Sequence, residues 1–120
     1  MTNPRYLPRE FAVDSRQFGK TEQIEWRSPS EADVMLHAAV MQHHVAVGTR
    51  ERMRSRRIGK VRVLATELGM DYARLTKLLN GRVVMRLEDV ALLRSFFAES
   101  EFDTFLVRAM RRRPSGQVQH

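Results

Sequence analysis

The chain contains no cysteine and no long apolar run, and each absence removes a class of protein from consideration. Without cysteine it has no disulfide bond, no thiolate metal ligand and no cysteine nucleophile, a composition that suits a reducing cytosol. No apolar stretch approaches the roughly 20 residues that cross a membrane. Residues 1–10 also lack the apolar core of a secretory signal. We therefore expect a cytoplasmic protein with no membrane partner.

Residues with the spacing needed for metal binding or catalysis are also scarce. His37 and His43 are six positions apart, so they do not share a helix face as the two histidines of an HExxH motif do. No carboxylate follows them at ligand spacing. The chain also has no glycine-rich phosphate loop and no Ser/His/Asp constellation. We expect no cofactor, no bound metal and no enzymatic activity.

Positive charge is present in excess and is concentrated in one region. The chain has 21 basic and 14 acidic residues, a formal net charge of +7. Ten of the basic and three of the acidic residues lie between Arg50 and Arg82, so this segment holds the whole excess. Such a basic region is the expected footprint of a surface that binds a polyanion. A solvated, arginine-rich helix face is the alternative that charge alone leaves open.

Residues 64–82 within this region have the apolar spacing of two short helices joined by a tight turn. Apolar residues recur about one helical turn apart in each half, as Leu64/Leu68 and Leu75/Leu78. Ala65 allows the two backbones to approach, and Gly69 can adopt the positive φ that ends the first helix. We expect helices at about 61–68 and 71–79, with Asp71 capping the second and Asn80-Gly81 ending it. A corner of this kind, at 61–80, is the unit that inserts its second helix into the DNA major groove.

The rest of the sequence predicts further helices around this pair. Four more amphipathic segments lie at about 29–47, 50–57, 87–98 and 101–112. In the first, the apolar stripe consists of Val34, Ala38, Met41 and Val45. Gly48 and Thr49 are expected to end that helix, and Gly59 to separate the next. The prediction is an all-α fold with a helical domain of five to six helices over 29–112.

The two ends of the chain have a different texture. In residues 1–28, prolines and a glycine punctuate short alternating pairs, Phe11/Val13 and Ile24/Trp26. Both a short hairpin and an irregular arm packed through its aromatic residues fit this pattern. Residues 113–120 are expected to form a flexible tail.

At residues 58–97 the sequence resembles the Cro/repressor-type (Xre-like) helix-turn-helix proteins. The resemblance lies in Leu64-Ala65, Leu68-Gly69, Met70, Leu75, Asn80-Gly81-Arg82 and the leucine-rich segment that begins at Leu87. Two positions depart from the family pattern. Val61 stands where a phosphate-bracing Gln is common, and Met85-Arg86 stand where Pro then Ser usually precede the fourth helix. We therefore expect the cap of that helix to be missing.

The resemblance implies a sequence-specific, nucleoid-associated DNA-binding regulator, a repressor that inserts helix 71–79 into the major groove. The side chains expected at base edges are Tyr72, Ala73, Arg74, Thr76 and Lys77. The residues expected at phosphates are Arg57, Lys60, Arg62, Asn80 and Arg82. Such modules usually bind as homodimers, and helices 101–112 and 29–47 are the candidate interfaces.

A second hypothesis starts from residues 1–49, which have no counterpart in that family. In an antitoxin or a phage or plasmid accessory protein, this segment would bind a protein partner. The helix-turn-helix would then serve autoregulation. Co-purification with a partner would distinguish the two hypotheses.

Overall fold

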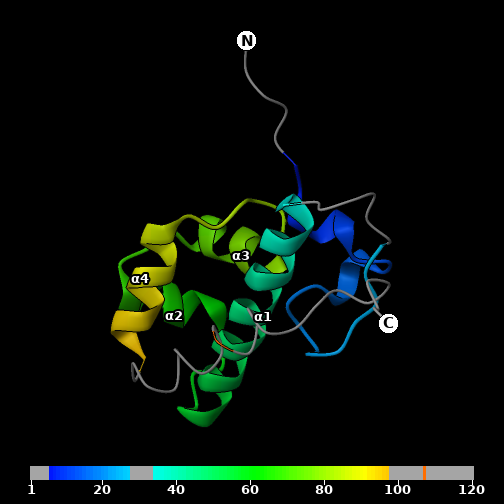
Figure 1. Ribbon diagram of the computed structural model, residues 1–120. Coiled ribbons are helices and arrows are strands. Elements are labelled where there is room, and N and C mark those ends of the chain that lie inside the picture. Colours follow the sequence, from blue (N-terminus) through cyan, green and yellow to red (C-terminus); the bar gives the residue numbers. More distant parts are fainter. Residues whose placement is uncertain (1–5, 28–33, 98–106, 108–120) are drawn as a thin grey trace.

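The computed structural model describes residues 6–27, 34–97 and 107, and these residues form an all-helical fold (Figure 1). Two 3₁₀ turns come first, η1 (Pro8–Phe11) and η2 (Ser15–Gln17). Four α-helices follow: α1 (Val34–Ser55), α2 (Val61–Leu68), α3 (Tyr72–Asn80) and α4 (Leu87–Phe96). The all-α prediction is confirmed, but the described part holds four helices rather than five to six. The predicted helix 101–112, of which only Val107 is described, and the tail 113–120 lie outside the described residues.

Helix α1 is continuous where the sequence predicted two helices, at 29–47 and 50–57. Gly48 is buried inside it, and the Thr49 hydroxyl donates to the Val45 carbonyl oxygen at 2.8 Å. Gly48 lies within the fully buried stretch of α1, and the i−4 hydrogen bond satisfies the threonine hydroxyl, so neither residue ends the helix. The prediction of a break at 48–49 was therefore wrong. Residues 28–33, where the helix was expected to start, are not described.

The end of α1 is set by Arg57 rather than by Gly59. Arg57 has a left-handed backbone with φ of 62°. The Arg57 amide donates to the Arg54 carbonyl at 3.1 Å, and the Ile58 amide donates to the Met53 carbonyl at 2.8 Å. This pair of bonds is a Schellman motif, with Ile58 and Met53 as its apolar partners. A non-glycine residue in this conformation costs about 1 kcal/mol.

The buried face of α1 differs from the predicted stripe. Val34 is 76% exposed and Met41 is 37% exposed, whereas Val45 is buried as expected. Leu36, Ala39 and Val40 pack instead against the N-terminal segment. From residue 42 to residue 49 every position is buried, because the N-terminal segment covers one side of α1 and helices α2–α4 cover the other.

The N-terminal segment is an irregular arm held by one antiparallel β-bridge, between Ala12 and Trp26. The Val13 amide donates to the Glu25 carbonyl at 2.9 Å, and the Arg27 amide donates to the Phe11 carbonyl at 2.8 Å. Of the two alternatives, the irregular arm is thus the better description. The two segments that contain the alternating residues do pair, over a single bridge rather than as a hairpin of strands. Figure 1 shows this arm against α1, on the side away from α4.

Candidate nucleic-acid interface

Helices α2 and α3 form the expected two-helix unit, joined by residues 69–71. Gly69 ends α2 with φ of 71°, and the Asp71 carboxylate caps α3 by accepting the Arg74 amide at 2.9 Å. Gly81 ends α3 with φ of 75°. The apolar positions of both helices are buried in one cluster with residues of α1: Leu64, Ala65, Leu68, Leu75 and Leu79. Leu78 is fully buried as well. The predicted bounds and burial pattern of this unit are confirmed to within one residue.

The side of α3 opposite its buried leucines is open at its first half. Tyr72 is 40% exposed, and Ala73 and Lys77 are also exposed. The guanidinium carbon of Arg62, at the start of α2, lies 4.2 Å from the centre of the Tyr72 ring. This cation–π contact places one basic and one aromatic side chain together at the N-terminal ends of both helices. The arrangement suits a surface where a phosphate and a base lie close to each other.

Thr76 lies on the same helix, but less of its side chain is exposed than the sequence predicted. Its side chain is half-buried, and its Oγ1 is covered and has no hydrogen-bond partner. In this rotamer the hydroxyl does not face outward. A rotation about χ1 is required before it can donate to or accept from a base edge.

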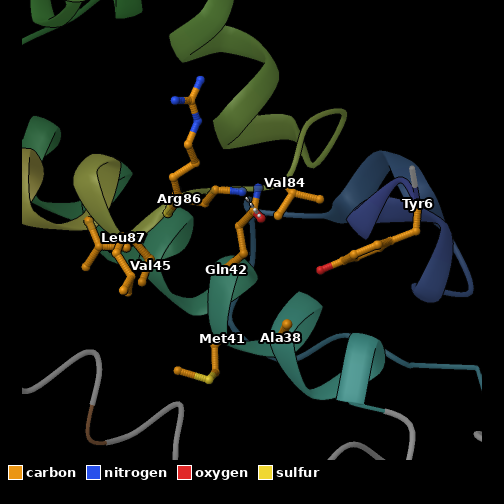
Figure 2. A pocket seen from close by; sticks show the side chains of 10 residues that line it. Tyr6, Ala38, Met41, Gln42, Val45, Val84, Arg86 and Leu87 are labelled. Atoms are coloured by element: carbon orange, nitrogen blue, oxygen red, sulfur yellow. Dashed lines mark hydrogen bonds between the residues drawn. The ribbon is translucent and has the colours of Figure 1, made fainter. Parts of the chain in front are cut away.

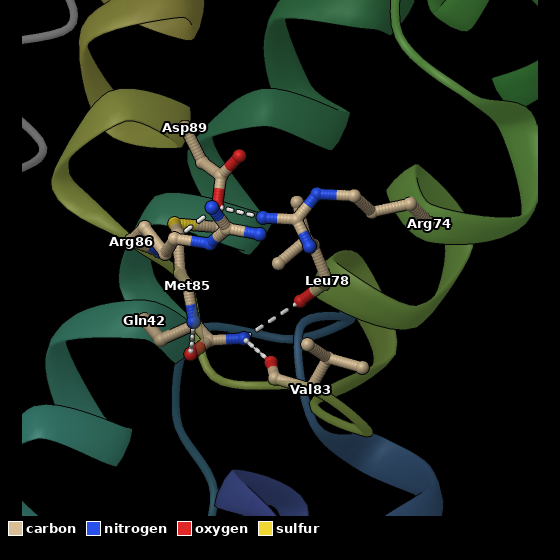
Figure 3. Close-up of polar contacts among 7 residues, drawn as sticks. All are labelled: Gln42, Arg74, Leu78, Val83, Met85, Arg86 and Asp89. Atoms are coloured by element: carbon tan, nitrogen blue, oxygen red, sulfur yellow. Dashed lines mark hydrogen bonds and ion pairs between the residues drawn. The ribbon is translucent and has the colours of Figure 1, made fainter.

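Arg74 does not join the outward group. Its Nη2 forms an ion pair at 2.5 Å with Oδ2 of Asp89, a buried residue of α4 (Figure 3). The same carboxylate oxygen accepts the Arg86 amide at 2.8 Å, at the N-terminus of α4. The Arg86 side chain forms no cap hydrogen bond at the start of α4, as the sequence predicted, and the Asp89 carboxylate accepts the Arg86 amide from within the first turn instead. Arg74 ties α3 to α4, although the sequence placed it among the base contacts.

The predicted phosphate contacts are divided between exposed side chains and one that is hydrogen-bonded internally. Lys60, Arg62 and Arg82 are exposed, whereas the Asn80 Oδ1 accepts a hydrogen bond from Arg50 Nη2 at 2.9 Å. Arg57 is exposed at the end of α1. Asn80 thus anchors the end of α3 to α1, while the other four leave their charges at the surface.

Gln42, which the sequence analysis did not single out, fixes the connection between α3 and α4. Its Nε2 donates to the carbonyl oxygens of Leu78 and Val83, each at 2.9 Å. Its Oε1 accepts the Met85 amide at 2.8 Å (Figure 3). One buried side chain therefore satisfies three main-chain groups at the end of α3 and in the following loop. The sequence signal was a glutamine inside a run without charged residues, from 34 to 49.

The N-terminal arm also holds the end of α3. The Arg9 amide donates to the Gly81 carbonyl at 2.9 Å. A Cβ atom at Gly81 would collide with the Phe18 ring, and one at Gly19 would collide with the Leu79 carbonyl oxygen. Both glycines have positive φ, so close approach and conformation together require them. The arm is a structural layer beneath α3.

His43 joins this arm to α1 from inside the core. Its Nδ1 accepts the Gly19 amide at 2.8 Å, and its Nε2 lies 3.2 Å from the Glu22 carbonyl oxygen. Trp26 and Phe18 pack edge-on against its ring. Burial lowers the pKa of His43, and the Glu22 carbonyl opposes that shift only in part. The imidazole is therefore neutral and structural.

An apolar groove of about 220 Å³ lies between α1 and the start of α4 (Figure 2). Ala38 and Met41 of α1 form one wall, and Val84 and Leu87 form the other. Leu87 is 84% exposed, the most open large apolar residue in the described part. Tyr6 closes one end of the groove.

Other site types find no support in the described residues. No group of three His, Asp or Glu side chains there could hold a metal ion. Among the described helices, none has the length and apolar character to span a membrane. Comparison with protein-family models, with curated proteins and with solved structures found no match for the chain.

Proposed function

We propose that this protein is a sequence-specific double-stranded DNA-binding regulator of transcription, a repressor of the Cro/repressor-like helix-turn-helix type. The observation that carries the proposal is the α2–α3 unit. Its second helix is held from behind by buried leucines and leaves Tyr72, Ala73 and Lys77 outward. The whole net positive charge of the chain lies in the segment that contains this unit. A rigid helix with a polar outer face and basic surroundings has the form of a major-groove reader.

In this proposal the outward side chains divide by role. Tyr72, Ala73, Thr76 and Lys77 read base edges from α3, with the Thr76 methyl or its reoriented hydroxyl as the contacting group. The phosphate contacts are Lys60, Arg62, Arg82 and Arg57, together with Asn80 where its amide nitrogen reaches the backbone. Arg74 supports the reader through Asp89 instead of reading a base itself.

Fluorescence anisotropy with duplexes from the promoter region of its own gene tests the proposal. We expect saturable binding, preference over a shuffled duplex, and an affinity that falls steeply with salt, because phosphate neutralisation releases counterions. Lys77→Gln should lower affinity, whereas Lys20→Gln, which removes the same charge from an exposed position of the arm, should not. Absent or salt-insensitive binding would overturn the proposal.

The proposal includes a homodimer, because one recognition helix covers few base pairs. The groove between α1 and α4 supplies an apolar surface for a second copy, and its α1 wall belongs to the helix expected at 29–47. A protein of this kind would act on the nucleoid in the cytoplasm.

The second candidate function is an antitoxin or a phage or plasmid accessory protein. The same groove favours it, because Tyr6, Ala38 and Met41 all belong to residues 1–49. Much of the rest of that segment is occupied internally, through Phe18, Trp26 and His43. Affinity purification of this protein from its native cell distinguishes the two functions. A second protein that co-purifies in stoichiometric amount with the wild type, and that no longer does so with Met41→Glu, would favour the accessory role.

A further inference from the structure

A second hollow, of about 420 Å³, lies between the end of α1 and the start of α2. Three arginines line this hollow: Arg50, Arg54 and Arg57. They are four and three positions apart in the sequence. Met53 and Ile58 form its apolar floor, and Gly59 and Val61 complete the rim. No acidic side chain is among the residues that line it.

The arginines of this hollow lack a counter-charge within the described residues. Arg54 and Arg57 form no hydrogen bond or ion pair there through their side chains. Arg50 donates through Nη2 to Asn80, but its Nε is buried without an acceptor. A buried donor without a partner is uncommon in proteins and calls for an acceptor such as a water or an anion. Burial, and secondarily the charge of Arg54, lower the pKa of Arg50, and a bound anion would oppose this shift because it favours the charged guanidinium.

The backbone around the hollow also favours an anion. The first two amides of α2, those of Val61 and Arg62, have no acceptor within the helix, whereas the Val63 amide donates to the Lys60 carbonyl. The positive end of the helix dipole lies at the same rim, which Gly59 and Val61 form. A Cβ atom at Gly59 would meet no atom within 4 Å, so the rim is open at this point. Arg57 holds its left-handed backbone beside this opening.

We propose that this hollow is a phosphate-binding site, in which Arg50, Arg54 and Arg57 surround a phosphate or pyrophosphate group next to the N-terminus of α2. Guanidinium groups match phosphate oxygens in charge and in paired hydrogen-bond geometry. The volume exceeds that of one phosphate, so there is room for two linked groups. The phosphate is either one on the DNA backbone or part of a free phosphorylated ligand. The site itself does not depend on the proposed function.

Isothermal titration calorimetry with pyrophosphate, on the full DNA-free chain at constant ionic strength, tests the site. We expect saturable binding of pyrophosphate, with a lower dissociation constant than that of sulfate under the same conditions. Arg57→Gly removes one guanidinium while supplying the residue that prefers a positive φ, so its melting temperature should be kept or raised. Its affinity for pyrophosphate should nevertheless fall about tenfold, as should that of Arg54→Gln.

Two substitutions at the rim and one elsewhere provide the controls. Gly59→Ala adds a methyl group to open space and should bind normally, whereas Gly59→Glu places a carboxylate in the rim and should abolish binding. Lys20→Gln lowers the net charge equally without touching the hollow and should bind as the wild type does. No saturable binding by the wild type, or equal affinity in Arg57→Gly and Lys20→Gln, would overturn the site.

Competition between pyrophosphate and DNA identifies the source of the phosphate. If pyrophosphate displaces the duplex and Arg54→Gln flattens the salt dependence of DNA binding, the hollow holds a backbone phosphate. If pyrophosphate binds without displacing DNA, the site takes a free phosphorylated ligand. Because calorimetry is done without DNA, failure of the DNA-binding proposal and failure of this site give different results.

Discussion

Among single residues, His43 shows most clearly how chemistry fixes the fold. Its two ring nitrogens have opposite roles, since Nδ1 accepts the Gly19 amide and Nε2 faces the Glu22 carbonyl. Only the neutral tautomer with its proton on Nε2 fits both partners. A second proton, on Nδ1, would point at the Gly19 amide hydrogen and would leave a charge in the core. The contact between arm and helix therefore depends on an uncharged histidine.

This dependence predicts a loss of stability in acid. The pKa of His43 is lower in the folded protein than the ordinary 6.5, so the unfolded chain takes up the proton first. Stability is then complete above about pH 6.5 and falls as the pH decreases, by at most about 1.4 kcal/mol per pH unit. Urea unfolding between pH 7.5 and about 5 measures this slope. His43→Gln should flatten it and the exposed His37→Gln should not; equal slopes in both variants would contradict the prediction.

Tyr72 of α3 and Arg82, which follows the end of this helix, predict two kinds of DNA-binding defect. Tyr72→Ala removes a side chain proposed to read bases, so the affinities for cognate and mismatched duplexes should converge by about 1–3 kcal/mol. Arg82→Ala should weaken all duplexes alike and should lower the salt slope by about one. Arg74→Ala should instead lower stability, because it leaves the buried Asp89 without its ion-pair partner. Anisotropy on matched duplex pairs, together with urea unfolding, separates these outcomes; identical behaviour of all three variants would refute the division of roles.

For the helices and loops, the connection from α3 to α4 depends on Gln42. Gln42→Leu preserves the volume but leaves the Val83 carbonyl oxygen and the Met85 amide without their partner, and it removes one of the two donors to the Leu78 carbonyl oxygen. The protein should therefore lose about 3 kcal/mol of stability. Gln23→Leu, the same change at an exposed position of the arm, should have little effect. Urea unfolding measures both variants. A loss below about 0.5 kcal/mol for Gln42→Leu would mean that water replaces these bonds.

Local signals predicted some of these elements and failed for others. The α2–α3 unit could be placed to within a residue because its apolar spacing, Gly69, Asp71 and Gly81 all act locally. The end of α1 could not, because an arginine in the left-handed conformation looks no different in the sequence from a helical one. Gly48 was misread because a glycine inside a long helix looks the same in the sequence as one at a helix end, and only the tertiary structure shows that it is buried within α1.

The candidate site was predictable in kind and less so in detail. The exposed positions of Tyr72, Ala73 and Lys77 followed from helical periodicity once Leu75 and Leu78 were taken as buried. The pairing of Arg74 with Asp89 did not, because it joins residues 15 positions apart on different helices. Long charged side chains reach across elements, so periodicity assigns their helix face but not their partner.

In the whole molecule, the arm and the helices form one structure around α1. Arg9, Phe18 and Gly19 of the arm all meet the last turn of α3 or the residue that caps it. The orientation of the proposed reading helix is therefore fixed both by its own core and by a segment more than 50 residues earlier. The proposed dimer uses the apolar groove between α1 and α4, which this packing leaves open.

That surface gives the prediction for the assembled molecule. Leu87→Glu and Met41→Glu each place a carboxylate in the groove between α1 and α4, where a second copy would bury an apolar side chain. Sedimentation equilibrium should show a wild-type dimer whose dissociation constant rises at least about tenfold in either variant. Val63→Glu changes an exposed apolar residue of α2 away from the groove and should leave the dimer intact.

The same surface predicts how the variants bind DNA. The groove variants should bind cognate DNA with two half-sites about 34 Å apart without cooperativity, and they should bind a single half-site as the wild type does. A wild-type monomer at all concentrations, or a dimer that neither groove variant weakens, would exclude this surface as the dimer interface.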